Sequence, residues 1–111
     1  MIEEIVLKYL NDNLDVEVST EKNDKLDTYV FIEKTAGGKD NFISRATIAI
    51  QSYASSKYKA AKLNVKVKNA MDNIIIMDQI SKSKLNNDYE FTDTAKKQYR
   101  YQAIYDLAYY E

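Results

Sequence analysis

The sequence predicts an α+β fold, in which a mostly antiparallel β-sheet of four to five strands packs against two helices. Apolar residues recur every three to four positions over 2–11 and 56–73, as they do on one face of an amphipathic helix. Apolar and polar residues alternate over 42–54 and 99–110, as they do in half-buried strands. The order of helix, strands, helix and strands favours α+β over repeated βα units. At 111 residues the chain is expected to form one domain over 1–111.

Each predicted helix combines an apolar face with a signal at its start. In the first helix, Glu3 and Glu4 occupy the first turn, where carboxylates favour the positive end of the helix. The second helix begins after Ser55 or Ser56, whose hydroxyl can cap the first turn. The apolar faces comprise Ile2, Ile5, Val6, Tyr9 and Leu10 in the first helix, and Ala60, Leu63, Val67, Ala70 and Ile74 in the second.

The middle of the chain predicts a hairpin with an extended tip. Residues 28–35 are rich in β-branched and aromatic side chains, and 42–54 form a long alternating strand. Between them lies "AGGKDN" (36–41), whose adjacent glycines indicate a turn that needs positive φ or a close backbone approach. A short half-exposed strand is expected over 14–20, and a polar turn is expected within 86–98.

The last strand carries tyrosine at alternate positions. Side chains in a strand alternate between its two faces, so one face is expected to hold Tyr99, Tyr101, Ala103, Tyr105, Leu107 and Tyr109. Tyrosine has an apolar ring and a polar hydroxyl, which suits either a core with a wet rim or an interface. Both interpretations are open for each of these tyrosines.

No catalytic constellation is recognisable, so we do not expect an enzyme, a cofactor or a metal. The chain has no cysteine and no histidine, which removes the thiolate nucleophile, the commonest general base and the commonest transition-metal ligand. The segment "DYEFTD" lacks the turn glycine and closing acid of a calcium loop, and "AGGKDN" lacks the Lys-Ser/Thr pair of a P-loop. A formal net charge of −1 and the absence of a long apolar run argue against bulk nucleic-acid binding and against a membrane partner.

Charge is unevenly distributed along the chain. Residues 1–33 contain nine acids and three lysines, whereas 41–71 contain six basic residues and no acid. On the second helix, Lys59, Lys62 and Lys66 share one face. Four interpretations are open: a solvated lysine face, a nucleic-acid patch that lacks interleaved exposed aromatic residues, charge balance between neighbouring elements, or head-to-tail contact between subunits.

Two segments resemble the tail terminator, or tail-completion, family of small tailed-bacteriophage proteins at the head–tail joint. The first segment has a strand, a Gly-Gly tip, an arginine-bearing strand ending in "QSYA", and a helix with Ser, Ala-Ala and Leu. Its matching residues are Gly37-Gly38, Arg45, Gln51 to Ala54, Ser55-Ser56, Ala60-Ala61 and Leu63. In the second segment an aromatic-acid loop with Tyr89, Phe91 and Asp93 precedes Arg100-Tyr101-Gln102. The resemblance covers 29–107, and Thr92 and Thr94 replace prolines that often flank the aspartate in the family.

The resemblance implies a structural virion protein that is assembled in the bacterial host cytoplasm. Family members form homo-oligomeric rings, often hexamers, that cap the tail tube, stop its polymerisation and dock the head. The implied partners are therefore further copies of the chain, the major tail tube protein and the head–tail connector protein. Candidate interface residues are Gly37, Gly38, Lys39, Asp40, Arg45, Lys59, Lys62, Lys66, Asp93, Arg100 and Tyr101. A head-completion or connector protein on the capsid side is the main alternative, and a nucleic-acid-binding adaptor is a further one.

Overall fold

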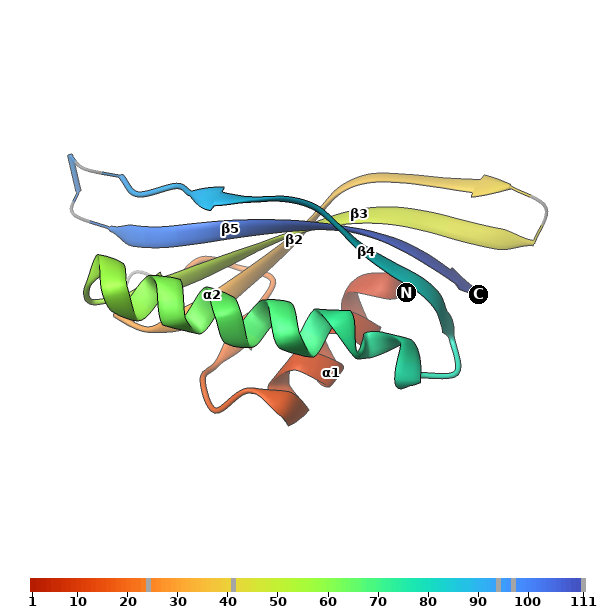
Figure 1. The fold of residues 1–111 in the computed structure, drawn as a ribbon, viewed down its shortest axis with the longest axis horizontal. Coiled ribbons are helices and arrows are strands. Elements are labelled where there is room, and N and C mark those ends of the chain that lie inside the picture. Colours follow the sequence, from red (N-terminus) through yellow and green to blue (C-terminus); the bar gives the residue numbers. More distant parts are fainter. Residues whose placement is uncertain (24, 41, 94, 97, 111) are drawn as a thin grey trace.

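The computed structural model describes residues 1–111 except Asp24, Asn41, Thr94, Lys97 and Glu111. It confirms the α+β class (Figure 1). The elements, in chain order, are α1 (Ile2–Asn13), β1 (Val18–Ser19), β2 (Tyr29–Asp40), β3 (Ile43–Ala54), α2 (Lys57–Asp72), the 3₁₀ turn η1 (Ile74–Ile76), β4 (Ile80–Glu90) and β5 (Tyr99–Tyr110).

The five strands form one twisted sheet in the order β1-β2-β3-β5-β4. Every neighbouring pair is antiparallel except β1 and β2, which are parallel. Both helices lie on the same side of this sheet, so the other side is open (Figure 1). Helix α2 packs against β3 and β5, and α1 packs against α2 and the β1–β2 edge. The β2–β3 hairpin and the β4–β5 connection project at opposite ends of a molecule 45 Å long (Figure 1).

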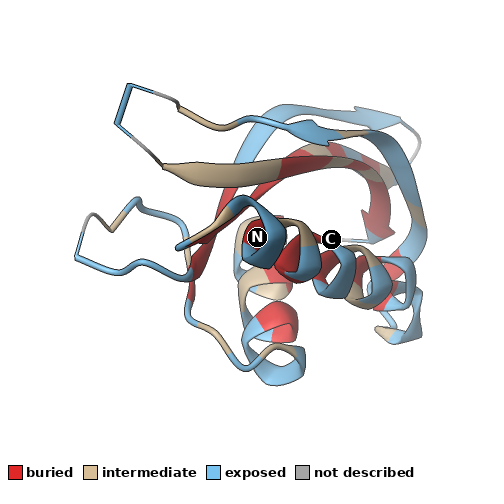
Figure 2. Ribbon diagram, turned by 60° about the vertical axis from the view of Figure 1, so that its left-hand side comes forward, coloured by how far each residue is buried: buried red, intermediate tan, exposed pale blue. Residues whose placement is uncertain are grey.

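The main core lies between the sheet and the helices, and both layers contribute buried residues to it (red in Figure 2). The tyrosine-bearing face of β5 turns inward, and Tyr105 and Tyr109 are buried in this core. The Tyr105 hydroxyl donates to the Asp72 carboxylate at 2.8 Å and lies 3.2 Å from the Lys68 carbonyl. Burial, reinforced by Asp72, raises the pKa of Tyr105 well above its ordinary value. The core interpretation therefore holds for these two tyrosines.

A smaller cluster lies on the open side of the sheet, where Tyr29, Phe31 and Tyr53 are buried. The rings of Tyr29 and Tyr53 are stacked, with centroids 4.6 Å apart. A chain of side-chain hydrogen bonds joins this cluster to neighbouring strands: Arg100 donates to Tyr53, Tyr53 to Gln51, Gln51 to Gln102, and Gln102 to Tyr89. One end of the open face is thus closed by aromatic and amide side chains.

The glycine pair does not form the predicted turn. Strand β2 continues to Asp40, and both Gly37 and Gly38 lie within it without positive φ. A bulge between Lys34 and Ala36 shifts the register of β2 against β3 by one residue. Beyond the bulge the two strands remain paired, with Gly38 opposite Arg45. Positive φ occurs instead at Phe42, with φ of 69°. The predicted hairpin is confirmed, since β2 and β3 pair in antiparallel fashion out to Asp40 and Ile43. The prediction that the glycines form its turn was wrong because a glycine that permits positive φ does not require it; Asn41 lies outside the described residues.

Two strands also differ in extent from the prediction. The strand expected over 14–20 is reduced to Val18–Ser19. The backbone nitrogen of Val18 donates to the Asn11 side-chain oxygen instead of to a strand. At the other edge, β4 runs to Glu90 through residues that were expected to form a polar turn. Its pairing with β5 has two register shifts, one between Ile80 and Lys82 and one between Leu85 and Asn87. Edge strands tolerate such polar, bulged sequences because only one side must pair.

Candidate assembly surfaces

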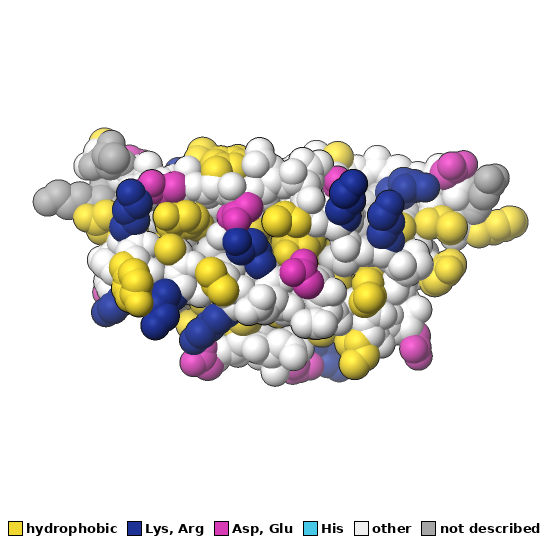
Figure 3. Space-filling model, in the orientation of Figure 1, with side chains coloured by type: hydrophobic (Ala, Val, Ile, Leu, Met, Phe, Trp, Pro, Cys, Tyr) yellow, Lys and Arg dark blue, Asp and Glu magenta, His cyan; other side chains and the backbone are white. Residues whose placement is uncertain are grey.

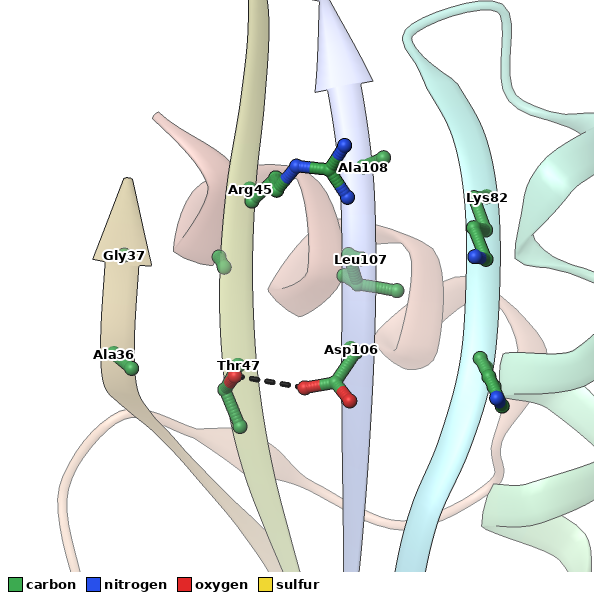
Figure 4. A pocket seen from close by; sticks show the side chains of 10 residues that line it. Ala36, Gly37, Arg45, Thr47, Lys82, Asp106, Leu107 and Ala108 are labelled. Carbon is green, nitrogen blue, oxygen red and sulfur yellow. Dashed lines mark hydrogen bonds between the residues drawn. The ribbon is translucent and has the colours of Figure 1, made fainter. Parts of the chain in front are cut away.

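A shallow hollow of about 330 Å³ lies on the open face of the sheet, near the end from which the β2–β3 hairpin projects (Figure 4). Small side chains of β2, β3 and β5 form its floor, including Ala36 and Ala108. Arg45 from β3, and Lys82 and Lys84 from β4, bring three cations to its lining. In Figure 4 the Arg45 side chain reaches over the neighbouring strand towards Ala108. We call this site the basic hollow.

One carboxylate, that of Asp106, also lies in the basic hollow, and neighbouring side chains already bind it. The Thr47 hydroxyl donates to one of its oxygens and the Asn86 amide to the other, each at 2.8 Å (Figure 4 shows the first contact). The three cations therefore exceed the acids of the hollow by two. A carboxylate or other anion carried by a second protein is the ligand that this charge balance suits.

The basic residues of α2 divide into two groups. Lys57 and Lys68 pair with acids of β4, at 3.2 Å from Glu90 and 2.6 Å from Asp88. A hydrogen bond from Thr92, together with Lys57, lowers the pKa of Glu90. In contrast, the predicted interface residues Lys59, Lys62 and Lys66 are exposed, and no ion pair joins them to any described residue. Intramolecular charge balance accounts for the first group alone.

An exposed aromatic residue lies among these lysines, contrary to the interpretation that the patch lacks one. Tyr58 is 71% exposed, and the Lys62 ammonium lies 5.4 Å from the centre of its ring. Helical geometry explains the difference, because Tyr58 is one turn before Lys62 and therefore shares its side of α2. Figure 3 shows this row of basic side chains along α2. A separate group of basic side chains lies at the other end of the sheet.

The remaining predicted residues hold the β4–β5 connection in place. Arg100 donates to the Phe91 carbonyl at 2.5 Å, and its guanidinium lies 4.4 Å from the centre of the Phe91 ring. Asp93 accepts hydrogen bonds from the backbone nitrogens of Ala95 and Lys96, which forms a tight local turn. Tyr101 is half-buried on the helix side of β5. These contacts assign Arg100 and Asp93 a positioning role within the chain; Thr94 lies outside the described residues.

The predicted interface residues therefore fall in separate places. Gly37 and Arg45 meet in the basic hollow, and Gly38 is the register partner of Arg45. Lys39 and Asp40 lie beside the hairpin tip, the three lysines lie on α2, and Asp93, Arg100 and Tyr101 lie at the opposite end of the sheet. Sequence reasoning missed Lys82, Lys84 and Asp106. The alternation in "SKSKL" could have indicated that both lysines share one face of an edge strand.

Carboxylates lie beside α1, on the side of the molecule opposite the basic hollow. The basic hollow is on the open face of the sheet, whereas Asp12 and Asp15 line grooves beside α1 on the helical side. Each of these carboxylates has a cation in the same groove, Lys8 beside Asp12 and Lys66 beside Asp15, and the helical side also carries the exposed lysines of α2. The carboxylates beside α1 can therefore meet the basic hollow of a second copy, but not the hollow of their own copy.

No protein-family model matches the chain, and no curated protein matches it either. Within the described part of the chain, no helix is both long and apolar enough to span a membrane. Among the same residues, no group of three or more acids is arranged to hold a metal ion.

Proposed function

We propose that the protein is a structural subunit of a phage head–tail joint, where copies of the chain form a ring. The ring, which the family resemblance suggests is a hexamer, caps the tail tube, stops its polymerisation and offers a surface to the head–tail connector protein. Its place is the virion, after assembly in the host cytoplasm. No catalytic activity, cofactor or membrane contact is expected of it.

One observation carries the assembly part of this proposal: the open face of the sheet holds a hollow with an excess of cations, whereas the grooves beside α1 on the other side carry carboxylates. Arg45, Lys82 and Lys84 line the first, and Asp12 and Asp15 lie on the second. Contact between two different surfaces is heterologous, and such contacts close into rings when the rotation permits. The location at a head–tail joint rests on the resemblance of residues 29–107.

Deletion of the gene from the phage or prophage genome tests the proposal. Electron micrographs of the induced lysate should show overlong tails and heads without tails, and a plasmid copy of the gene should restore joined particles. Tails of normal length that remain joined to heads would refute it. DNA-filled heads that fail to mature, with tails of normal length, would instead favour the head-completion alternative.

A nucleic-acid-binding adaptor is a second candidate, because Tyr58 is exposed beside Lys62 on α2. Lysines bind phosphates and an exposed aromatic ring can stack on a base. Binding to single-stranded DNA at physiological salt, lost in a Lys59→Glu, Lys62→Glu, Lys66→Glu variant, would support this candidate. No binding at low salt would reject it.

A further inference from the structure

Phe42 occupies a conformation and an environment that both disfavour it. It lies directly before Ile43, which pairs with Asp40, so it belongs to the tip of the β2–β3 hairpin. Its φ of 69° is in the left-handed region, which glycine adopts freely and a bulky residue adopts with strain. Its side chain is also 90% exposed, so the ring remains in water. Glycine at this position would remove both penalties, and it is the residue that such tight hairpin turns prefer.

The Phe42 ring contributes little to the stability of the folded chain, because a side chain this exposed makes few contacts within it. We infer that Phe42 is an anchor residue that inserts into an apolar groove on a second copy of the chain. Aromatic side chains that fill a partner's pocket commonly dominate the energy of an interface. This inference rests on the proposed self-assembly and names one contact within it.

A groove that could receive the ring lies on the helical side, between α1 and the segment that follows α2. It has a volume of about 510 Å³, and its apolar lining comes from Tyr9, Ile76 and Met77. Ile76 is 78% exposed, so this groove carries an uncovered apolar side chain of its own. Both the tip and the groove thus present apolar surface that no described part of the same chain covers.

Charges beside the two surfaces are complementary. Lys39 and Asp40 are exposed next to Phe42 at the tip, and Lys8 and Asp12 line the groove. Each surface therefore offers one cation and one anion to the other. Exposed pairs of this kind add little affinity but fix orientation and disfavour wrong partners. We pair Asp40 with Lys8 and Lys39 with Asp12.

The tip and the groove are different surfaces, so the contact leads from one subunit to the next in one direction. Such a contact leaves a free tip and a free groove on every dimer, and it can extend into a ring or a filament. A second copy is the occupant that the uncovered apolar surfaces and the charges on this chain support.

Sedimentation velocity over a concentration series tests the contact, with urea unfolding of each variant as a check of folding. Phe42→Gly should weaken self-association roughly thirtyfold, the effect of losing one buried aromatic anchor, while the monomer is as stable as the wild type or more stable. Ile76→Glu should weaken association similarly from the groove side. Val65→Ala, an exposed apolar change on α2, is the matched control and should associate like the wild type.

A charge exchange tests the pairing of the two surfaces. Asp40→Lys and Lys8→Asp should each weaken association, and the double variant should recover much of it. Equal association of Phe42→Gly and wild type would overturn the inference and leave the ring proposal standing. Loss with Phe42→Gly but not with Ile76→Glu would overturn the choice of groove. Binding of Phe42 to another protein, without self-association, would overturn the second-copy assignment.

A wild-type chain that stays monomeric at every concentration and also on purified tail tubes would contradict the self-assembly on which both proposals depend. The two failures are therefore distinguishable, because one is seen in the wild type and the other only in the variants.

Discussion

Gln51 donates a side-chain hydrogen bond of 2.8 Å to Gln102 across β3 and β5, and both glutamines are buried on the open face of the sheet. This bond is the middle of the chain that joins Arg100 and Tyr53 to Tyr89. The strands at one end of the sheet are therefore held together by polar side chains as well as by their backbones. This face needs no covering helix at that end.

Gln51→Leu should destabilise the chain by about 2–4 kcal/mol, because it leaves the Gln102 carbonyl without its donor and the Tyr53 hydroxyl without its acceptor. The double variant with Gln102→Leu should lose much less than the sum of the two single losses, as measured by urea unfolding. Gln79→Leu, at an exposed glutamine, is the control and should change stability little. Additive losses would show that the two amides do not act as a pair.

Ser56→Ala should destabilise the chain by about 1 kcal/mol, because the Ser56 hydroxyl accepts a hydrogen bond from the Lys59 nitrogen at the start of α2. Ser55→Ala is the matched control and should have little effect, since Ser55 is exposed and precedes the cap. Thermal unfolding of both variants would distinguish them, and equal stability of the two would contradict the capping role.

Tyr105→Phe should reduce the loss of stability at alkaline pH. The pKa of Tyr105 is raised in the folded chain, so its favourable contribution is complete below its ordinary pKa of 10.0 and declines as the pH rises above that value. Urea unfolding between pH 8 and about pH 11 should therefore show a shallower decline for the variant than for the wild type. Burial also raises the pKa of Tyr9, so part of the decline should remain.

At neutral pH the same variant should lose about 1 kcal/mol, because the hydrogen bond to Asp72 is removed. Tyr110→Phe, at an exposed tyrosine of the same strand, is the control. An identical alkaline decline in wild type and Tyr105→Phe would contradict the raised pKa.

Gly38→Ala should stabilise the chain by about 0.5–1 kcal/mol, because glycine within a strand loses more conformational freedom on folding than alanine does. Gly38 has no positive φ, and an added Cβ would meet no atom within 4 Å. Gly37→Ala should gain less, since its Cβ would come within 2.7 Å of the Lys34 side chain. Loss of stability in Gly38→Ala, measured by urea unfolding, would show that the glycine is needed within the monomer.

The elements with the strongest periodicity were predictable from the sequence. Helix α2 begins after Ser56 as expected, and β5 covers the alternating segment 99–110. The apolar residues of α2 are spaced as on one face of a helix, and those of β5 are spaced as on one face of a strand. The sheet edges were less predictable, since β1 and the outer half of β4 bury few side chains and leave little pattern in the sequence.

The candidate surfaces were only partly predictable, because their residues come from strands that the chain order does not place together. Arg45 of β3 and Lys82 of β4 are separated by β5 in the sheet, and nothing in the sequence fixes that order. Phe42 was assigned to the alternating strand, whereas it has positive φ directly before the Asp40–Ile43 pair that ends the hairpin ladder. Such features follow from strand order and register, which local patterns do not determine.

Immunogold labelling of virion parts tests the central proposal most directly. Antibodies against this chain should label the head-proximal end of isolated tails, one site for each tail, and should leave tails from the gene-deletion strain unlabelled. A purified virion preparation without label at the head–tail joint would contradict the proposal.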